Sequence, residues 1–255
     1  MNTPAQVAEN YVPIAVGKGN MPRGKMFLLA ILAGMFIALA GVGSAIGNTV
    51  AGKLAGACVF PAGLAMVVLA GSELFTGNCM MVIAVAERRL TAKKCLIAAV
   101  IVYVGNFVGA LLVAWLSVCG GTFSACYDAL IATAVAKTSL SFAEAFLRGV
   151  LCNVLVCLAV WMAFAAKDAG GKILAVFFPI MLFVLCGFEH CVANMFYIPG
   201  GLFACLRYGV TAQGLSWGSM LVKNLLPVTL GNIVGGAGLG MLFWAIHLRR
   251  AKVSV

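Results

Sequence analysis

The chain has 255 residues, of which 64% are hydrophobic and 9% are charged, and its formal net charge is +10. Soluble domains average about 45–50% apolar and 25% charged residues, so this composition excludes a soluble globular protein. Because each helical crossing of a bilayer needs roughly 20 apolar residues, the length accommodates about six spans and no additional soluble domain. We therefore predict an all-α integral membrane protein.

The first 25 residues differ from the rest of the chain because they contain charges and no long apolar run. Glu9, Lys18, Arg23 and Lys25 lie in this segment, which therefore lacks the apolar core of a cleaved signal peptide. We predict a cytoplasmic N-terminal segment over residues 1–25, a six-span membrane domain over residues 26–248 and a basic cytoplasmic tail over residues 249–255.

Six apolar runs follow in chain order. The second and fifth are longer than one bilayer crossing needs, and polar clusters interrupt them at residues 71–78 and 187–194. Interruptions of this kind are typical of broken membrane helices. We predict six transmembrane helices, the second and fifth of them broken, over Met26–Ile46, Leu54–Ala86, Cys95–Ser117, Phe142–Ala166, Ile173–Leu206 and Leu225–Leu248.

The basic residues predict the orientation of these spans. Of the 17 Lys and Arg residues, twelve precede the first span, follow the second, follow the fourth or follow the sixth. Cytoplasmic loops of membrane proteins carry an excess of Lys and Arg, so this bias predicts that both termini are cytoplasmic. The predicted location is the cell membrane, with the chain crossing the bilayer several times.

The two interruptions are copies of one pattern. Gly71, Glu73 and Asn78 match Gly187, Glu189 and Asn194, each 116 positions further along the chain. A second match, 126 positions apart, relates residues 105–109 to residues 231–235, both of the form Gly-Asn-x-Val-Gly. Three spans followed by three similar spans lie in opposite orientations, which is the inverted-repeat plan of many transporters. The duplication predicts a site between the two breaks.

The breaks favour an anionic ligand. Backbone groups freed within a membrane are tolerated only where protein or a water-filled path covers them. Helix N-termini there present N–H donors and partial positive charge, which attract anions. His190 lies in the second break and is the one histidine within a span. Since its ordinary pKa is near 6.5, it can exchange a proton with a weak acid, or it can simply brace the break as a neutral side chain.

Glu73 and Glu189 occupy matched positions in the two breaks. Because bare carboxylates would oppose an anion path, we expect them to accept hydrogen bonds from the N–H groups that each break frees. We assign the matched Asn78 and Asn194 to the same structural role at the helix breaks.

Three further polar residues have two possible roles each. Thr76 follows the first break, where its hydroxyl can cap a helix or contact a solute. Lys137, with Asp128 as the acid nearby in sequence, is either a solvated lysine or a charge that draws anions to the mouth. Asn153 lies among apolar residues of the fourth span and is expected to face the protein interior rather than lipid.

Other functional classes lack their residue patterns. The ten cysteines lie mostly in apolar runs without metal-ligand spacing, and Cys119 and Cys126 either pair or stay free. One intramembrane histidine without a cofactor loop or nucleophile constellation does not make an enzyme. We therefore predict no catalysis, no cofactor, no metal and no nucleic-acid partner.

Four segments closely resemble the formate/nitrite transporter family. They are Gly-Ser-Glu-Leu-Phe-Thr-Gly-Asn at 71–78, Asn-Val-Leu-Val-Cys-Leu-Ala-Val-Trp-Met at 153–162, Gly-Phe-Glu-His-Cys-Val-Ala-Asn-Met-Phe at 187–196 and Leu-Pro-Val-Thr-Leu-Gly-Asn-Ile-Val-Gly-Gly at 226–236. The resemblance implies an aquaporin-like protomer within a homopentamer, in a lipid bilayer, with one pore in each protomer. Members of the family conduct formate, nitrite, hydrosulfide, lactate or acetate.

The resemblance also implies roles for residues of the pathway. The central histidine of the family corresponds to His190, its loop threonine to Thr76, its vestibule lysine to Lys137 and its vestibule asparagine to Asn153. The implied constrictions are formed on the outer side by Phe60 and Phe183, and on the inner side by Leu64, Leu74 and Val156. The implied mechanism draws the anion in by Lys137 and lets it cross as the neutral acid after protonation near His190, by the histidine or by water.

Three alternatives concern the solute. The run Gly-Phe-Glu-His at 187–190, with Ala-Asn-Met-Phe-Tyr-Ile-Pro at 193–199, is more similar to the formate branch than to the nitrite branch. Hydrosulfide or nitrite would use the same pore. A neutral-solute channel of the aquaporin type is disfavoured because paired Asn-Pro-Ala motifs are missing from the sequence.

Overall fold

The first half of the chain builds two intact spans around one broken span. We describe residues 1–249 of a computed structural model, and the predicted tail lies outside the described residues from position 250 on. Helix α2 (Arg23–Ala51) and helix α7 (Ala92–Cys119) cross the molecule without interruption. Between them the second span consists of α3 (Lys53–Val59) and α4 (Pro61–Ala70), then a break, then α5 (Phe75–Asn78), η1 (Cys79–Met81) and α6 (Val82–Ala86).

The second half repeats this arrangement. Helix α9 (Phe142–Ala165) and helix α13 (Leu226–His247) are its intact spans, and α13 follows the short α12 (Trp217–Ser219) and the π-helical turn η2 (Met220–Leu225). The broken span consists of α10 (Ala169–Leu185) and α11 (Cys191–Tyr208). Within residues 1–249 the predicted six spans, with breaks in the second and fifth, are therefore confirmed, and the span ends lie within a few residues of the predicted ones.

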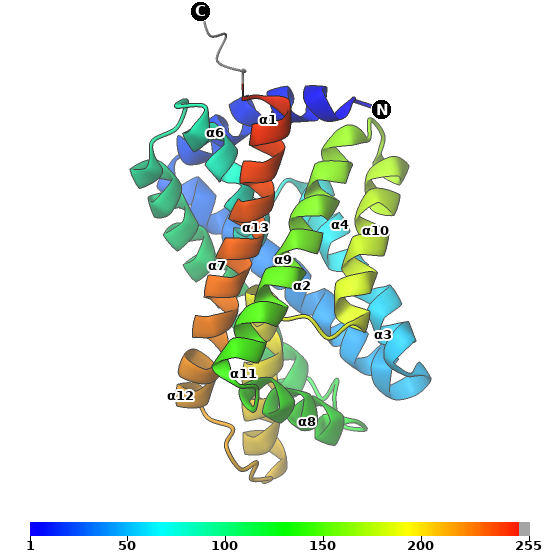
Figure 1. The fold of residues 1–255 in the computed structure, drawn as a ribbon. Helices are drawn as coiled ribbons and strands as arrows, with labels where there is room; N and C mark the ends of the chain where they lie inside the picture. Colours follow the sequence, from blue (N-terminus) through cyan, green and yellow to red (C-terminus); the bar gives the residue numbers. More distant parts are fainter. Residues whose placement is uncertain (250–255) are drawn as a thin grey trace, which may run out of the picture.

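Two helices outside the spans were not predicted. Helix α1 (Pro4–Gly19) begins at a capping box formed by Thr3 and Gln6 and lies across one end of the molecule. Helix α8 (Tyr127–Thr138) lies at the other end (Figure 1). The N-terminus and the end of α13 lie near α1, so we call this end the α1 face and the opposite end the α8 face.

These two helices extend the internal repeat. Helix α2 begins at Arg23 and α9 begins at Phe142, 119 positions later, and α1 and α8 end at Gly19 and Thr138, again 119 positions apart. Each therefore precedes the first span of its half. The molecule has related helices at both faces, as an inverted repeat requires.

Glycine makes both breaks possible. Gly71 ends α4 with φ +72°, and Gly187 follows α10 with φ +69°. Side chains disfavour this left-handed backbone, whereas glycine adopts it readily, which explains why the two repeats share a glycine here.

Glycine also brings the intact spans together. A Cβ atom at Gly109 would collide with the Ile31 carbonyl oxygen of α2, and one at Gly235 would collide with the Val150 carbonyl oxygen of α9. Helix α7 therefore packs backbone to backbone on α2, and α13 packs in the same way on α9. This contact fixes the helices that carry the polar groups at the breaks.

Candidate functional site

The two breaks meet in the middle of the protein. His190 precedes α11, where its Nδ1 accepts a hydrogen bond from the Ala193 backbone N–H at 3.1 Å. Its Nε2 lies 2.9 Å from Oγ1 of Thr76, which lies in α5 directly after the first break. Since Nδ1 is an acceptor, the neutral ring carries its hydrogen on Nε2 and donates it to Thr76. Both side chains are buried, and the contact joins residues 114 positions apart.

Asparagines of α7 and α13 satisfy the backbone of the breaks. Oδ1 of Asn106 accepts from the Phe75 N–H at 2.9 Å, while its Nδ2 donates to the carbonyl oxygens of Ala30 and Glu73. Asn106 is fully buried. A side chain that both donates and accepts is suited to a break, because a break frees N–H and C=O groups together.

Asn232 makes the same three bonds in the second half. Its Oδ1 accepts from the Cys191 N–H at 2.9 Å, and its Nδ2 donates to the carbonyl oxygens of Gly149 and Glu189. Asn106 and Asn232 are the asparagines of the Gly-Asn-x-Val-Gly repeat. The sequence showed the repeated motif, but only the structure shows which groups it satisfies.

The prediction that Glu73 and Glu189 accept hydrogen bonds from the freed backbone N–H groups was wrong. The carboxylate of Glu73 binds Nζ of Lys18 at 2.8 Å and Nδ2 of Asn78 at 2.7 Å. Lys18 also donates to Oδ1 of Asn78 at 3.0 Å. The freed Phe75 N–H binds Asn106 instead. A carboxylate has no donor for the freed carbonyls, whereas its charge compensates a lysine brought in by α1.

Glu189 has matching partners. Its carboxylate accepts from Nζ of Lys137 at 2.9 Å and from Nδ2 of Asn194 at 2.6 Å, and Asn224 approaches it at 3.3 Å. Lys137 lies 5.4 Å from the centre of the Tyr197 ring. The acidic partner of Lys137 is therefore Glu189 and not Asp128. Lys137 is neither a plainly solvated lysine nor a free charge.

Asn153 faces the protein interior, as expected. Its Nδ2 donates to the carbonyl oxygens of Thr76 at 3.2 Å and Asn232 at 2.6 Å, and the residue is fully buried. It thereby ties α9 to the first break and to α13. A role in contact with the solute stays a prediction.

The predicted outer constriction consists of two aromatic rings in contact. Phe60 and Phe183 pack edge to face with their centres 5.6 Å apart, and Phe183 lies over the His190 ring at 5.9 Å. The residues predicted for the inner constriction, Leu64, Leu74 and Val156, are each 2% exposed or less. An apolar barrier therefore lies beside the His190–Thr76 contact.

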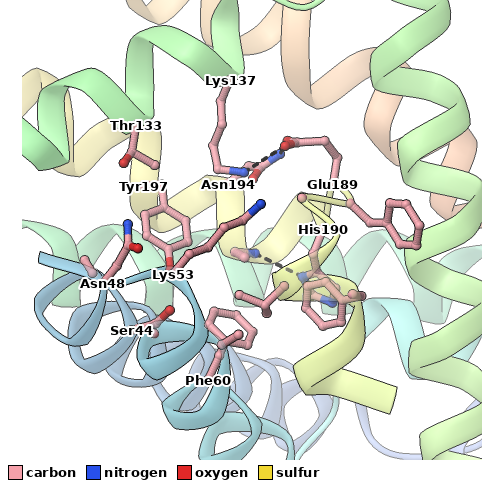
Figure 2. A pocket seen from close by; sticks show the side chains of 18 residues that line it. Ser44, Asn48, Lys53, Phe60, Thr133, Lys137, Glu189, His190, Asn194 and Tyr197 are labelled. Atoms are coloured by element: carbon pink, nitrogen blue, oxygen red, sulfur yellow. Dashed lines mark hydrogen bonds and ion pairs between the residues drawn. The ribbon is translucent and has the colours of Figure 1, made fainter. Parts of the chain in front are cut away.

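Two cavities lie on opposite sides of this barrier. The cavity at the α8 face, of about 160 Å³, is lined by Phe60, Phe183, His190 and Lys137 among others (Figure 2). The cavity at the α1 face, of about 400 Å³, is lined by Leu64, Leu74 and Lys18. Each cavity thus holds one lysine–glutamate pair. Burial raises the pKa of Tyr11, which lines the second cavity, well above its ordinary value, so its hydroxyl stays neutral.

The site contains residues that the sequence did not single out. Lys18 falls in the predicted N-terminal segment, and no role is predicted for Asn224. The signal for Lys18 lies in the repeat, because Lys18 and Lys137 are 119 positions apart, as are the starts of α2 and α9. No pattern around Asn224 indicates its contact with Glu189.

Comparison with known proteins identifies the family. The family described as "Formate/nitrite transporter" matches residues 5–246. The chain belongs to the formate/nitrite transporter family. A "Probable formate transporter" of Methanothermobacter thermautotrophicus is 42% identical, with 97% of each chain covered. The "Formate channel FocA" of Haemophilus influenzae is 39% identical, with 92% of this chain and 90% of the relative covered.

Solved structures agree with this assignment. A "Pentameric formate channel with formate bound" superposes with a TM-score of 0.77 at 33% identity, covering 89% of this chain and 98% of that one. An "FNT family ion channel" superposes with a TM-score of 0.83 at 30% identity, covering 95% of this chain and 98% of that one. The protein is therefore a membrane-spanning transporter of this family with the aquaporin-like fold of its structural neighbours.

Proposed function

We propose that each protomer forms a pore for small monovalent weak-acid anions, that formate is the preferred solute, and that passage is linked to a proton. The observation that carries the proposal is that an apolar barrier and the His190–Thr76 contact lie between two cavities. The cavity that holds the Lys137–Glu189 pair adjoins two apolar rings and the His190–Thr76 contact, and the cavity that holds the Lys18–Glu73 pair lies on the other side of the barrier.

The apolar barrier supports linkage to a proton. An unpaired charge in an apolar constriction loses its hydration without compensation, which is strongly unfavourable. The neutral acid avoids this cost, and formic acid is small enough for a narrow passage. A weak-acid anion can therefore enter as an ion, cross as an acid and leave as an ion.

His190 has a defined part in this proposal. Its Nδ1 accepts from the Ala193 N–H, so a proton on Nδ1 would replace this hydrogen bond with two facing donors. We therefore assign the acid's proton to water at the cavity. His190 then donates from Nε2, either to Thr76 or to an oxygen of the passing acid.

The assembly and orientation complete the proposal. We infer a homopentamer in the cell membrane, because a similar structure is that of a pentameric formate channel. We infer that the α1 face is cytoplasmic, because the bias of basic residues favours cytoplasmic termini. A reporter that is active only outside the cytoplasm, fused after Val255, is expected to be inactive, and an active fusion would reverse the orientation.

Uptake into proteoliposomes tests the solute. Formate, nitrite, acetate, lactate and hydrosulfide are each presented at about pH 5 and pH 8 and followed by stopped flow. We expect formate to be fastest and all weak acids to be faster at the lower pH. Preference for nitrite or hydrosulfide would change the assigned solute, whereas flux independent of pH would contradict the proton linkage.

A further inference from the structure

The cavity at the α8 face contains two lysines with different surroundings. Nζ of Lys137 is 2.9 Å from the Glu189 carboxylate, and its side chain is 15% exposed. Lys53, the first residue of α3, is exposed and lines the same cavity. Among residues 1–249, no carboxylate lies within ion-pair distance of Lys53. Figure 2 shows its side chain extending across the cavity with the amine free.

The ion pair cancels much of the field that Lys137 would exert on an approaching anion. An anion that binds Lys137 directly also has to compete with Glu189, whose carboxylate is held by Lys137, Asn194 and Asn224. Removing a charge from such a buried pair leaves the other uncompensated. The charge of Lys53 has no such competitor, so it dominates the attraction at this mouth.

Neutral hydrogen-bonding groups line the cavity together with Lys53. Asn48, Thr133, Ser44 and Tyr197 line the same cavity (Figure 2). Asn48 is exposed, and its Cβ lies close to Gly56 of α3. A cavity with an exposed ammonium, an amide and hydroxyls in its lining matches the charge and the acceptors of a small carboxylate or oxyanion.

We propose that Lys53 is the centre of an anion-capture site at the α8 face, and that Lys137 serves instead to neutralise and position Glu189. The inference rests on the proposed function, since it names the site where the transported anion first binds. It reassigns the charge that attracts the anion from Lys137 to Lys53. The ligand class is a small monovalent anion, carboxylate or inorganic.

Transport kinetics give the first test. Lys53→Gln should raise the KM for formate entering from the α8 face by about three- to tenfold at low ionic strength, with little change in maximal flux. The difference in KM between Lys53→Gln and the wild type should shrink in 1 M salt, where the Debye length is about 3 Å. Lys53→Arg should retain the wild-type KM. Lys223→Gln is the matched control, because Lys223 is an exposed lysine that lines a different groove near α12.

Chemical labelling gives a second test that does not depend on transport. An Asn48→Cys variant is treated with negatively and positively charged methanethiosulfonate reagents, and modification of residue 48 is measured by mass spectrometry. We measure the ratio of the rate with the negative reagent to the rate with the positive reagent, and the Lys53 charge should raise this ratio. Adding Lys53→Gln should lower the ratio about three- to tenfold at low salt. Adding Lys223→Gln should leave it unchanged.

The outcomes separate the inference from the proposed function. If no weak acid crosses but the labelling ratio depends on Lys53, the capture site stands and the proposed transport is wrong. If formate crosses normally while Lys53→Gln matches Lys223→Gln in both KM and labelling, the inference is overturned. A rise in KM that occurs only in Lys137→Gln, with maximal flux unchanged, would return the capture role to Lys137.

Discussion

Replacing Asn232 by alanine should destabilise the protein strongly. The side chain is fully buried and makes three hydrogen bonds, with the Cys191 N–H and with the carbonyl oxygens of Gly149 and Glu189. Asn232→Ala leaves all three backbone groups without this partner in the buried interior. Each buried polar group left unsatisfied costs about 1–3 kcal/mol, so the three groups together predict a loss of about 3–9 kcal/mol.

The assay is equilibrium unfolding of the purified protein in mixed micelles, followed by circular dichroism. The related Asn106→Ala should lose a similar amount, because Asn106 makes the equivalent three bonds. Asn48→Ala is the matched control, since Asn48 is exposed and lies at the α8 face. A surface substitution of this kind should stay within about 0.5 kcal/mol. A loss below about 1 kcal/mol for Asn232→Ala would refute the assignment of these asparagines as the groups that satisfy the breaks.

Two further predictions concern the ion pair and the threonine. Lys137→Gln leaves the buried Glu189 carboxylate without its lysine and should lower the yield of assembled protein. Combining it with Glu189→Gln should recover part of this yield, because the uncompensated buried charge is gone. Size-exclusion profiles measure the yield, and a double variant no better than Lys137→Gln alone would contradict the prediction. Thr76→Val removes the hydroxyl that contacts His190 and should slow formate flux at least tenfold, because losing one hydrogen bond of about 1.4 kcal/mol corresponds to a tenfold change in rate. Thr76→Ser keeps a hydroxyl and should retain most of the flux. Equal flux in the valine and serine variants would show that the hydroxyl is not needed.

The sequence was sufficient to predict the spans and breaks because both leave local signals. Long apolar runs indicate spans, and polar clusters within them indicate breaks. The shared glycines at 71 and 187 belong to the repeated pattern, and the structure adds the reason for them, because both have a positive φ that glycine adopts easily. The repeat also predicted that the two breaks lie together, and His190 and Thr76 do make contact.

Pairings between distant residues could not be predicted in the same way. The contact of Lys18 with Glu73 joins residues 55 positions apart, and that of Asn224 with Glu189 joins residues 35 positions apart. Spacing shows which residues are equivalent, but not which acceptor reaches which donor. For this reason the sequence led us to predict that the glutamates accept from the freed N–H groups, whereas Asn106 of α7 and Asn232 of α13 bind these groups.

The short helices at the two faces escaped prediction for a related reason. Helix α1 contains Pro13 and charged residues, and α8 is 12 residues long. Neither has an apolar run that separates it from a loop by composition alone. Their positions become clear only when their ends are compared across the repeat.

Formate flux through His190→Asn protein at about pH 5 and pH 8, on either side of the ordinary histidine pKa, tests the central claim most directly. Asparagine is a good residue at a helix N-terminus and can still accept from the Ala193 N–H, so the second break should keep its structure. The hydrogen bond from Nε2 to Thr76 is lost. We expect a normal size-exclusion profile and formate flux below the wild-type value at both pH values, because the donor that meets the passing acid is missing; this flux should still rise at pH 5, because water supplies the proton, and His190→Phe should abolish or greatly slow it. An intact assembly of either variant with wild-type flux at both pH values would contradict the account.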